Sequence, residues 1–569
     1  MVRAMTQGTK HDKKSEGSVK DTVISMVISL AMALIAKIYV VEAFVIPTGS
    51  MAPTLLGQHM AFRSPETGYS WTVNPWYYSG QAPLSPQGVV RAGGVREFPI
   101  VSDPMTLSAV FGERIPANNM YPTGLNLDPR EPVALRAGDR ILVQKYLYFI
   151  SSPKRWDVVV FKNPEQSREN YIKRLIGLPN EQVWLVDGDV FVRERPANVD
   201  PGSSNDPGED SEWSIARKPD LVQRELWRTV FSSEYTPLSP LDRRTGRRFF
   251  TTPWSGDGWE TADRRVFRTD RAERTELVWD HENWPVTDWE AYNDQRRGAG
   301  DVSMGRSSGV KPVYPVSDVR VRAGVLPERA DIRVEATVEA RGHVFQGVLE
   351  NGRAVVRMRE QGSDGAWTDL ASGSAPGFRA GRVTNVEFWH VDQSLHLWVD
   401  GRRVVEGSYS WGPKERLLHS TGRHGSDYSS MNALSPVSLY ERSKPRISWS
   451  FEGSAVELHR VGLDRDVWYQ PTPYYDPPQT NTPGFGTHPW NLATMGPDHF
   501  FVLGDNSPSS RDARMWTGVD RDVAQQIDDT RGVVHRNLML GKAFYVYFPA
   551  PRSMGRIPIP DFGTMRWIR

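Results

Sequence analysis

The pattern of apolar and polar positions first separates a tail and an apolar run from the rest of the chain. Residues 1–21 are polar and basic, which is typical of a disordered cytoplasmic tail. A run of about 20 mostly apolar residues follows, long enough to cross a bilayer, and predicts a transmembrane anchor over residues 22–43. The basic tail predicts a cytoplasmic N-terminus, with the remaining chain on the outer, periplasmic side of the cell membrane.

The same run has an alternative interpretation as a cleaved signal peptide. Such a peptide has an apolar stretch of roughly 7–15 residues that ends at a small-x-small cleavage site. This run is longer, and residues 42–47 contain no such site, which favours an uncleaved anchor. Its one charged residue, Lys37, lies near the outer end and can reach the lipid headgroups.

Downstream of the apolar run, the hydrophobic pattern predicts short β-strands. They are expected at residues 138–146, 156–161, 171–178 and 182–192, and Asp187-Gly188 predicts a hairpin turn in the last of these. Residues 57–137 show no clear periodicity and are interpreted as an irregular insertion. The first part of a β core is therefore expected over residues 44–195.

A second β domain is predicted in the middle of the chain. Apolar and polar residues alternate over 332–339, and Asn351-Gly352 and Asp400-Gly401 are typical hairpin turns. Short strands at regular spacing favour a β-sandwich at about 317–465, within an inserted region at 196–490. Through Val386–Asp400 and its Trp-Val-Asp-Gly turn, this domain resembles the concanavalin/laminin-G-like jelly-roll class. Residues 196–310 are polar and Trp-rich, with weak strand signals. The second part of the β core is expected over residues 491–569, after a Pro-rich bridge.

Composition excludes several function classes. The chain has 69 basic and 68 acidic residues, and a net charge of +1 gives no electrostatic reason to expect nucleic-acid binding. Because it contains no cysteine, disulfides, thiol catalysis and cysteine-ligated zinc are excluded. The 12 histidines show no metal-ligand spacing. Neither a metal nor a cofactor is expected.

Two residues outside the sandwich suggest a reaction. Ser50 follows the apolar run in the turn-like segment Pro47–Leu55, and Lys173 is the lysine of a strand-like apolar segment. A serine hydroxyl needs a base to become a nucleophile, and a neutral lysine can be that base. Keeping a lysine neutral at pH 7 costs about 4.6 kcal/mol, which burial among apolar neighbours can supply. The hypothesis is a membrane-anchored Ser-Lys protease.

Four ordered segments together resemble the type I signal (leader) peptidase family. They are residues 47–55, residues 138–143 with 157–161, residues 171–179, and Gly504-Asp-Asn506 running to Arg514, and Gly541-Lys-Ala543 also matches. The resemblance covers less than half of the chain. It implies a β catalytic core outside the membrane that removes signal peptides from exported preproteins after small residues at −1 and −3. The chain is then a mainly β protein with a transmembrane helix, a signal-peptidase-type core and an inserted sandwich.

The resemblance also implies roles for individual residues. Ser50 would be the nucleophile and Lys173 the general base. Thr48 matches the oxyanion-hole hydroxyl, Ser510 the serine that orients the lysine, and Asp512 and Arg514 the supporting ion pair. The positions that line the pockets for small residues are Phe44, Ile46, Leu55 and Ile172. Departures from the family are Ala513 in place of serine, Asn180-Glu181 in place of Gly-Asp, and Trp156 in place of glycine.

Other functions stay open at the level of sequence. The chain could instead be a catalytically inactive, membrane-tethered binding protein whose β-sandwich binds a glycan or an envelope protein. Carboxylates such as Glu282 and Asp288 could serve a glycosidase, although nothing in the sequence places them together. The partners expected from the main hypothesis are signal-peptide-bearing preproteins and the lipid bilayer.

Overall fold

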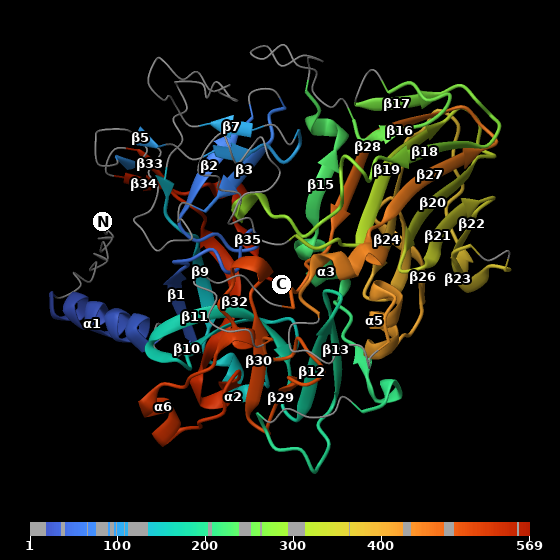
Figure 1. The fold of residues 1–569 in the computed structure, drawn as a ribbon. Helices are drawn as coiled ribbons and strands as arrows, with labels where there is room; N and C mark the ends of the chain where they lie inside the picture. Colours follow the sequence, from blue (N-terminus) through green and yellow to red (C-terminus); the bar gives the residue numbers. More distant parts are fainter. Residues whose placement is uncertain are drawn as a thin grey trace, which may run out of the picture.

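The computed structural model describes most of the chain. The described ranges are 19–35, 40–64, 67–74, 100–106, 109–111, 135–202, 208–237, 252–261, 265–293, 313–362, 365–424, 434–471, 483–554 and 557–569, with two short strands at 89–90 and 96–97. The chain is mainly β (Figure 1).

The apolar run forms helix α1 (Val19–Ile35), which projects from the edge of the body. Strand β1 (Val41–Val45) begins inside the segment expected to be the anchor, so residues 41–43 of that segment are strand rather than helix. The reason is that Val41–Val45 pair with β9 along their whole length. Among the described residues, no helix combines the length and the apolar character needed to cross a membrane.

One eight-stranded sheet joins the two ends of the chain. Its strands are β1, β9 (Arg140–Gln144), β32 (Met539–Phe548), β10 (Val158–Asn163), β11 (Gln166–Gly177), β30 (His499–Leu503) and β31 (Val534–His535), in this order, with β35 (Arg566–Trp567) paired to β32. Neighbouring strands in this sheet come from distant parts of the sequence, as β32 lies between β9 and β10. This arrangement places the segment after β1 close to the middle of β11 and the end of β30.

A four-stranded sheet extends the core. Its order is β14 (Ser214–Ile215), β13 (Asp189–Glu194), β12 (Glu181–Val186) and β29 (Ala493–Thr494). The expected hairpin turn is confirmed: Asp187 and Gly188, both at positive φ, connect β12 to β13. The region expected to be irregular contains a small sheet of β3 (Ser70–Val73), β2 (His59–Arg63) and β8 (Leu135–Arg136), and two short hairpins, β4–β5 (Val89–Val90, Arg96–Glu97) and β6–β7 (Ile100–Ser102, Ala109–Phe111).

The inserted region forms a sandwich of two antiparallel sheets. One contains β15 (Arg228–Ser232), β28 (Val456–Arg465), β19 (Val319–Pro327), β24 (Thr384–Val391), β25 (Ser394–Val399) and β26 (Arg402–Ser408), with β17 (Val266–Thr269) paired to β28. The other contains β16 (Trp254–Ser255), β18 (Thr275–Trp279), β27 (Arg446–Glu452), β20 (Arg333–Ala340), β21 (His343–Glu350), β22 (Arg353–Glu360) and β23 (Thr368–Ser374). The turns expected at Asn351-Gly352 and Asp400-Gly401 are confirmed.

The sandwich begins earlier than the expected boundary at residue 317. Strands β15 to β18, from residues 228–279, complete both of its sheets. These strands are too short for an alternating pattern of apolar and polar residues to be recognised, and they place tryptophans such as Trp254 and Trp279 in the core.

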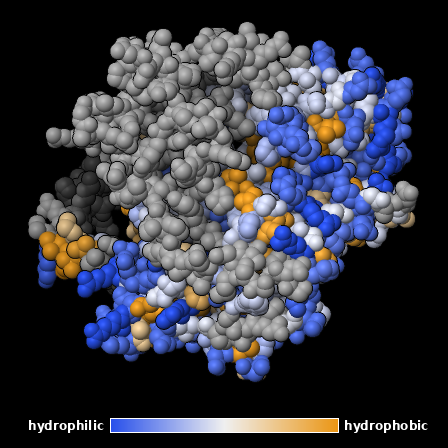
Figure 2. Space-filling view, in the orientation of Figure 1, coloured by the Kyte–Doolittle hydropathy of each residue, from blue (hydrophilic) through white to orange (hydrophobic). Residues whose placement is uncertain are grey.

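The visible surface of the sandwich is largely hydrophilic (Figure 2). The short helices are α2 (Leu147–Ile150), α3 (Asp220–Leu226), α5 (Pro413–Thr421) and α6 (Arg521–Gln526), and β33 (Arg552–Met554) pairs with β34 (Ile557–Ile559).

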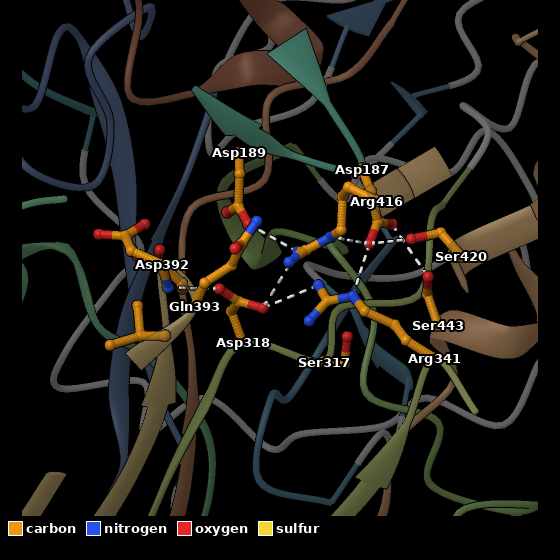
Figure 3. A network of polar contacts seen from close by, with 12 residues as sticks. Asp187, Asp189, Ser317, Asp318, Arg341, Asp392, Gln393, Arg416, Ser420 and Ser443 are labelled. Atoms are coloured by element: carbon orange, nitrogen blue, oxygen red, sulfur yellow. Dashed lines mark hydrogen bonds and ion pairs between the residues drawn. The ribbon is translucent and has the colours of Figure 1, made fainter. Parts of the chain in front are cut away.

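A buried ionic network fixes the sandwich to the core (Figure 3). Asp187, in the β12–β13 turn, pairs with Arg341 at 2.7 Å and with Arg416 of α5 at 3.1 Å. Arg341 also pairs with Asp318 at 2.8 Å, and Arg416 with Asp189 at 2.6 Å. Because these side chains are almost fully buried, removing one partner would leave an uncompensated charge. The two domains are therefore expected to keep a fixed relation to each other.

Candidate active site

Residues 46–56, which follow β1, form the serine turn, a tight turn that carries Ser50. Both ends of the turn are held by the buried residue Asp139: the Ile46 N–H donates to its carbonyl at 2.9 Å, and the Leu56 N–H donates to its carboxylate at 3.0 Å. Within the turn, Met51 is fully buried and Ser50 stays partly exposed. The apolar side chain anchors the turn and leaves the hydroxyl accessible.

Lys173 meets Ser50 at this turn. Lys173 lies on β11, opposite Val159 of β10. Its Nζ donates to Ser50 Oγ at 2.6 Å and to the carbonyl of Ile172 at 3.1 Å. The structure therefore brings together a hydroxyl and an amine that are 123 positions apart in the sequence.

The surroundings of Lys173 favour its neutral form. Burial lowers the pKa of Lys173 from 10.5 to about 8, since its side chain is almost completely removed from water. Asp512 and Asp505 act to raise this pKa and Arg514 to lower it, but burial has the largest effect. Both carboxylates form their own ion pairs, with Arg514 and Arg174. An amine with a pKa of about 8 is roughly one tenth neutral at pH 7.

The loop that follows β30 packs against the serine turn. The Asn506 N–H donates to the Ser50 carbonyl at 3.1 Å, and the Asn506 side-chain amide donates to the Gly49 carbonyl at 2.9 Å. Gly504 permits this close approach. A Cβ at Gly504 would lie 2.4 Å from the Ser50 carbonyl oxygen and 2.2 Å from Ser510 Oγ, so any side chain there would displace the turn.

A buried ion pair organises the same loop. Arg514 donates to the two carboxylate oxygens of Asp512 at 2.9 and 2.8 Å, and both residues are almost fully buried. Asp512 also accepts from the Gly504 N–H at 3.0 Å, and Arg514 donates to the Gln470 carbonyl at 2.9 Å. The pair therefore connects the loop to the glycine that contacts Ser50. Removing one member of such a pair typically costs about 3–5 kcal/mol.

Over part of its length the chain is similar to known signal peptidases. Residues 109–232 match the family described as signal peptidase, peptidase S26. Signal peptidase I of Buchnera aphidicola is 38% identical over 82 residues, 12% of this chain and 23% of that protein. Probable signal peptidase I-2 of Synechocystis is 25% identical over 202 residues, 34% of this chain and 82% of that protein. Part of this chain is therefore similar to signal peptidases, over residues 109–232 in the family match.

The signal peptidase match has a limited extent. This chain spans about a quarter of the Buchnera relative, about half of a Rickettsia typhi signal peptidase I and most of the Synechocystis one. The segment matched by the family includes Lys173, and Ser50 and Ser510 lie outside it. Among solved structures, a Bacillus subtilis protein with a galectin-like fold shows 9% identity and a TM-score of 0.23, over 42% of this chain and 98% of its own. A score this low supports no inference about the sandwich.

The four residues expected to line the signal peptidase pockets lie together. Phe44, Ile46, Leu55 and Ile172 belong to one apolar cluster, which also contains Met51 from the serine turn. Leu55 and Ile46 are 0% and 2% exposed, so they form the floor of this cluster. Phe44 is half-buried and Ile172 is 8% exposed.

Two further expected site residues lie near Ser50, and one of them lacks the contact that the resemblance implies. Thr48 is exposed, two positions before Ser50. Ser510 is fully buried beside Gly504, but its Oγ has no hydrogen-bond partner among the described residues. The lysine donates to Ser50 and to the Ile172 carbonyl instead of bonding to Ser510. No hydrogen bond among the described residues therefore supports a role for Ser510 in orienting Lys173.

Two departures from the family occur where the backbone favours glycine. Trp156 has φ of 75° and Asn180 has φ of 62°. Asparagine adopts this left-handed region readily, whereas a bulky residue there is strained. The Trp156 indole N–H donates to the carbonyl of Arg217, and Lys218 lies 5.4 Å from its ring centroid. These contacts offset the backbone strain at Trp156, and both partners, Arg217 and Lys218, belong to the inserted region.

Sequence reasoning missed the inserted residues that touch the serine turn. The ring of Tyr292 packs on Gly49, where a Cβ would lie 2.2 Å from it. Asn293 exchanges two side-chain hydrogen bonds with Asn506, of 2.6 and 3.0 Å. These contacts carry no local sequence signal, because they depend on how the insertion folds back over the core. Sequence reasoning also missed Arg174, whose guanidinium makes a buried bidentate pair with Asp505 in the loop after β30.

Proposed function

We propose that the chain is a membrane-bound serine endopeptidase that removes N-terminal signal peptides from exported preproteins. The observation that carries the proposal is the 2.6 Å contact between Ser50 Oγ and the buried amine of Lys173. The family match supplies the substrate class. A catalytically inactive binding protein would have no use for a serine and a buried lysine held at this distance.

Ser50 would act as the nucleophile and Lys173 as the base. As Ser50 Oγ attacks the scissile carbonyl carbon, its proton passes to Lys173 Nζ. The resulting ammonium gives that proton to the leaving amine of the mature chain, and the signal peptide remains esterified to Ser50. Lys173 then deprotonates a water molecule that attacks the ester, and it returns the proton to Ser50 Oγ as the signal peptide leaves. The backbone N–H of Ser50 and the hydroxyl of Thr48 are the donors we assign to the oxyanion.

Small residues at −1 and −3 would be selected by the apolar cluster beside the turn. Because Ile46 and Leu55 are already packed there, little depth remains for a substrate side chain. A shallow pocket excludes large residues by overlap. The extended peptide would bind beside Ile172, which precedes the base.

Attachment to the cell membrane would occur through α1 (Val19–Ile35). Side chains of α1 such as Val23, Met26 and Leu30 are 53%, 68% and 60% exposed, so this helix leaves its apolar side chains unpacked against the protein. The hydrophobic surface of α1 is visible at the edge of the molecule (Figure 2). An apolar helix of this kind gains free energy from contact with lipid. The basic tail would lie in the cytoplasm and the core on the periplasmic side.

The test is cleavage of a preprotein that carries Ala-x-Ala before the cut. The wild-type protein should release the mature chain with a new N-terminus directly after the second alanine. Ser50→Ala should abolish this release without changing the melting temperature. Lys162→Ala is the matched control, because Lys162 is an exposed lysine on the neighbouring strand β10. Equal cleavage by wild type and Ser50→Ala would show that the function is wrong.

A further inference from the structure

A cavity of about 560 Å³ lies next to the serine turn, on the side of the inserted region. Its size falls within the range of roughly 300–1,000 Å³ that is usual for ligand sites. Pro53 and Leu56 of the serine turn form one wall, β3 and the residue before it a second, and inserted segments at 227–230 and 284–292 a third. Figure 1 shows β3 and β15, which contribute two of these walls.

The cavity lies across the serine turn from the cluster expected to hold the −1 and −3 residues. Leu55 packs into that cluster, whereas the next residue, Leu56, lines the cavity. Pro53, also in its wall, is three positions from Ser50, which bounds the separation of their Cα atoms at roughly 10 Å. An extended peptide advances about 3.3 Å per residue. A chain cleaved at Ser50 would therefore reach the cavity within a few residues of the cut.

The cavity wall is also connected to the nucleophile. Tyr292 lines the cavity and packs on Gly49, the residue before Ser50. The next residue, Asn293, bonds to Asn506, which in turn donates to the carbonyls of Gly49 and Ser50. A side chain bound in the cavity would thus contact the group that holds the serine turn in place.

The chemistry of the walls favours an aromatic or large apolar occupant. The aromatic side chains around the cavity are Tyr69, Trp71, Trp227, Trp284, Trp289 and Tyr292. The charged groups at its border are engaged with one another, since Glu290 lies 3.8 Å from Arg228 and 3.4 Å from Arg465. Because the two guanidiniums outnumber the single carboxylate, the border of the cavity is positively charged and disfavours a cationic side chain.

We propose that this cavity binds an aromatic or large apolar side chain from the mature segment of the substrate, a few residues after the cut. The inference rests on the proposed function and adds a second specificity determinant to it. The inserted region would then select preproteins by the start of their mature sequence.

The experiment compares preproteins that share one Ala-x-Ala site and differ at one mature position. Phenylalanine or serine is placed at each of positions +1 to +6, and kcat/KM is measured with the full-length enzyme. We expect phenylalanine to be preferred at one or two positions by about tenfold or more. Trp289→Ala should reduce this ratio toward one, and Trp289→Phe should retain most of it. Trp490→Ala is the control, because Trp490 is a 49% exposed tryptophan that does not line the cavity.

A second variant keeps the test decisive if Trp289→Ala folds poorly. Ser70 is exposed and lines the cavity, so Ser70→Trp should fill the space from its rim and remove the phenylalanine preference. Equal kcat/KM for phenylalanine and serine at all six positions in the wild type would overturn the proposal, and so would a preference that survives Ser70→Trp. Failure to cleave any substrate would instead refute the proposed function itself.

Discussion

The pH dependence of cleavage follows from the burial of Lys173. In the proposed mechanism catalysis requires the neutral amine, so kcat/KM should rise with pH and reach a plateau above the pKa of Lys173. With that pKa at about 8, the neutral fraction increases about tenfold between pH 7 and pH 9. With the ordinary value of 10.5, the increase over the same interval would be about a hundredfold, with no plateau.

The assay uses a preprotein without titratable groups near the cut, measured from pH 6 to pH 10. Ser50→Ala supplies the background hydrolysis at each pH, and a thermal melt of the enzyme at each pH excludes unfolding as a cause. A plateau above about pH 9 with a midpoint near 8 is expected. A rate that still climbs about eightfold from pH 9 to pH 10 would refute the reasoning, because that is the increase expected for a base with the ordinary pKa of 10.5.

Three further predictions concern stability and fit. The pKa of Lys173 is lower in the folded than in the unfolded chain, so the free energy of unfolding should rise with pH between about 8 and 10.5. Lys173→Met should therefore stabilise the protein at pH 7 by up to about 3 kcal/mol, and thermal melts should show this gain fading above pH 10. Gly504→Ala should abolish cleavage, since its Cβ would collide with Ser510 Oγ, whereas Gly377→Ala, in open space, should be neutral in the same assay. Arg341→Gln should destabilise the protein by about 3–5 kcal/mol in urea unfolding; a loss below about 1 kcal/mol would show that the ionic network is not needed.

Much of the core could be predicted because its signals are local. Two-residue turns such as Asp187-Gly188 and Asn351-Gly352 fix hairpins by backbone conformation alone, and apolar alternation marks the long strands of the sandwich. The order of several motifs along the chain points to Ser50 and Lys173, whereas the residues that flank either one alone do not. Their 2.6 Å contact depends on strand order in the sheet, which no periodicity encodes.

The rest depends on tertiary contacts that leave no trace in the sequence pattern. Strands β16 to β18 are too short to show a period. They are stabilised by pairing, β17 with β28, β18 with β27, and β16 with β18. Tyr292 and Asn293 are ordinary residues in a Trp-rich stretch until the insertion places them on the serine turn. The partners of Ser510 were inferred by resemblance, and the hydrogen bonds of Lys173 differ from that inference.

The most direct test of the central claim is a single-turnover assay with purified Lys173→Ala. Enzyme is held in excess over an Ala-x-Ala preprotein at pH 9, so that chemistry rather than product release is measured. The Ser50–Lys173 account predicts loss of at least about a thousandfold in the rate, with an unchanged fold by circular dichroism. Cleavage by Lys173→Ala at a rate near that of the wild type would show that Ser50 has another base.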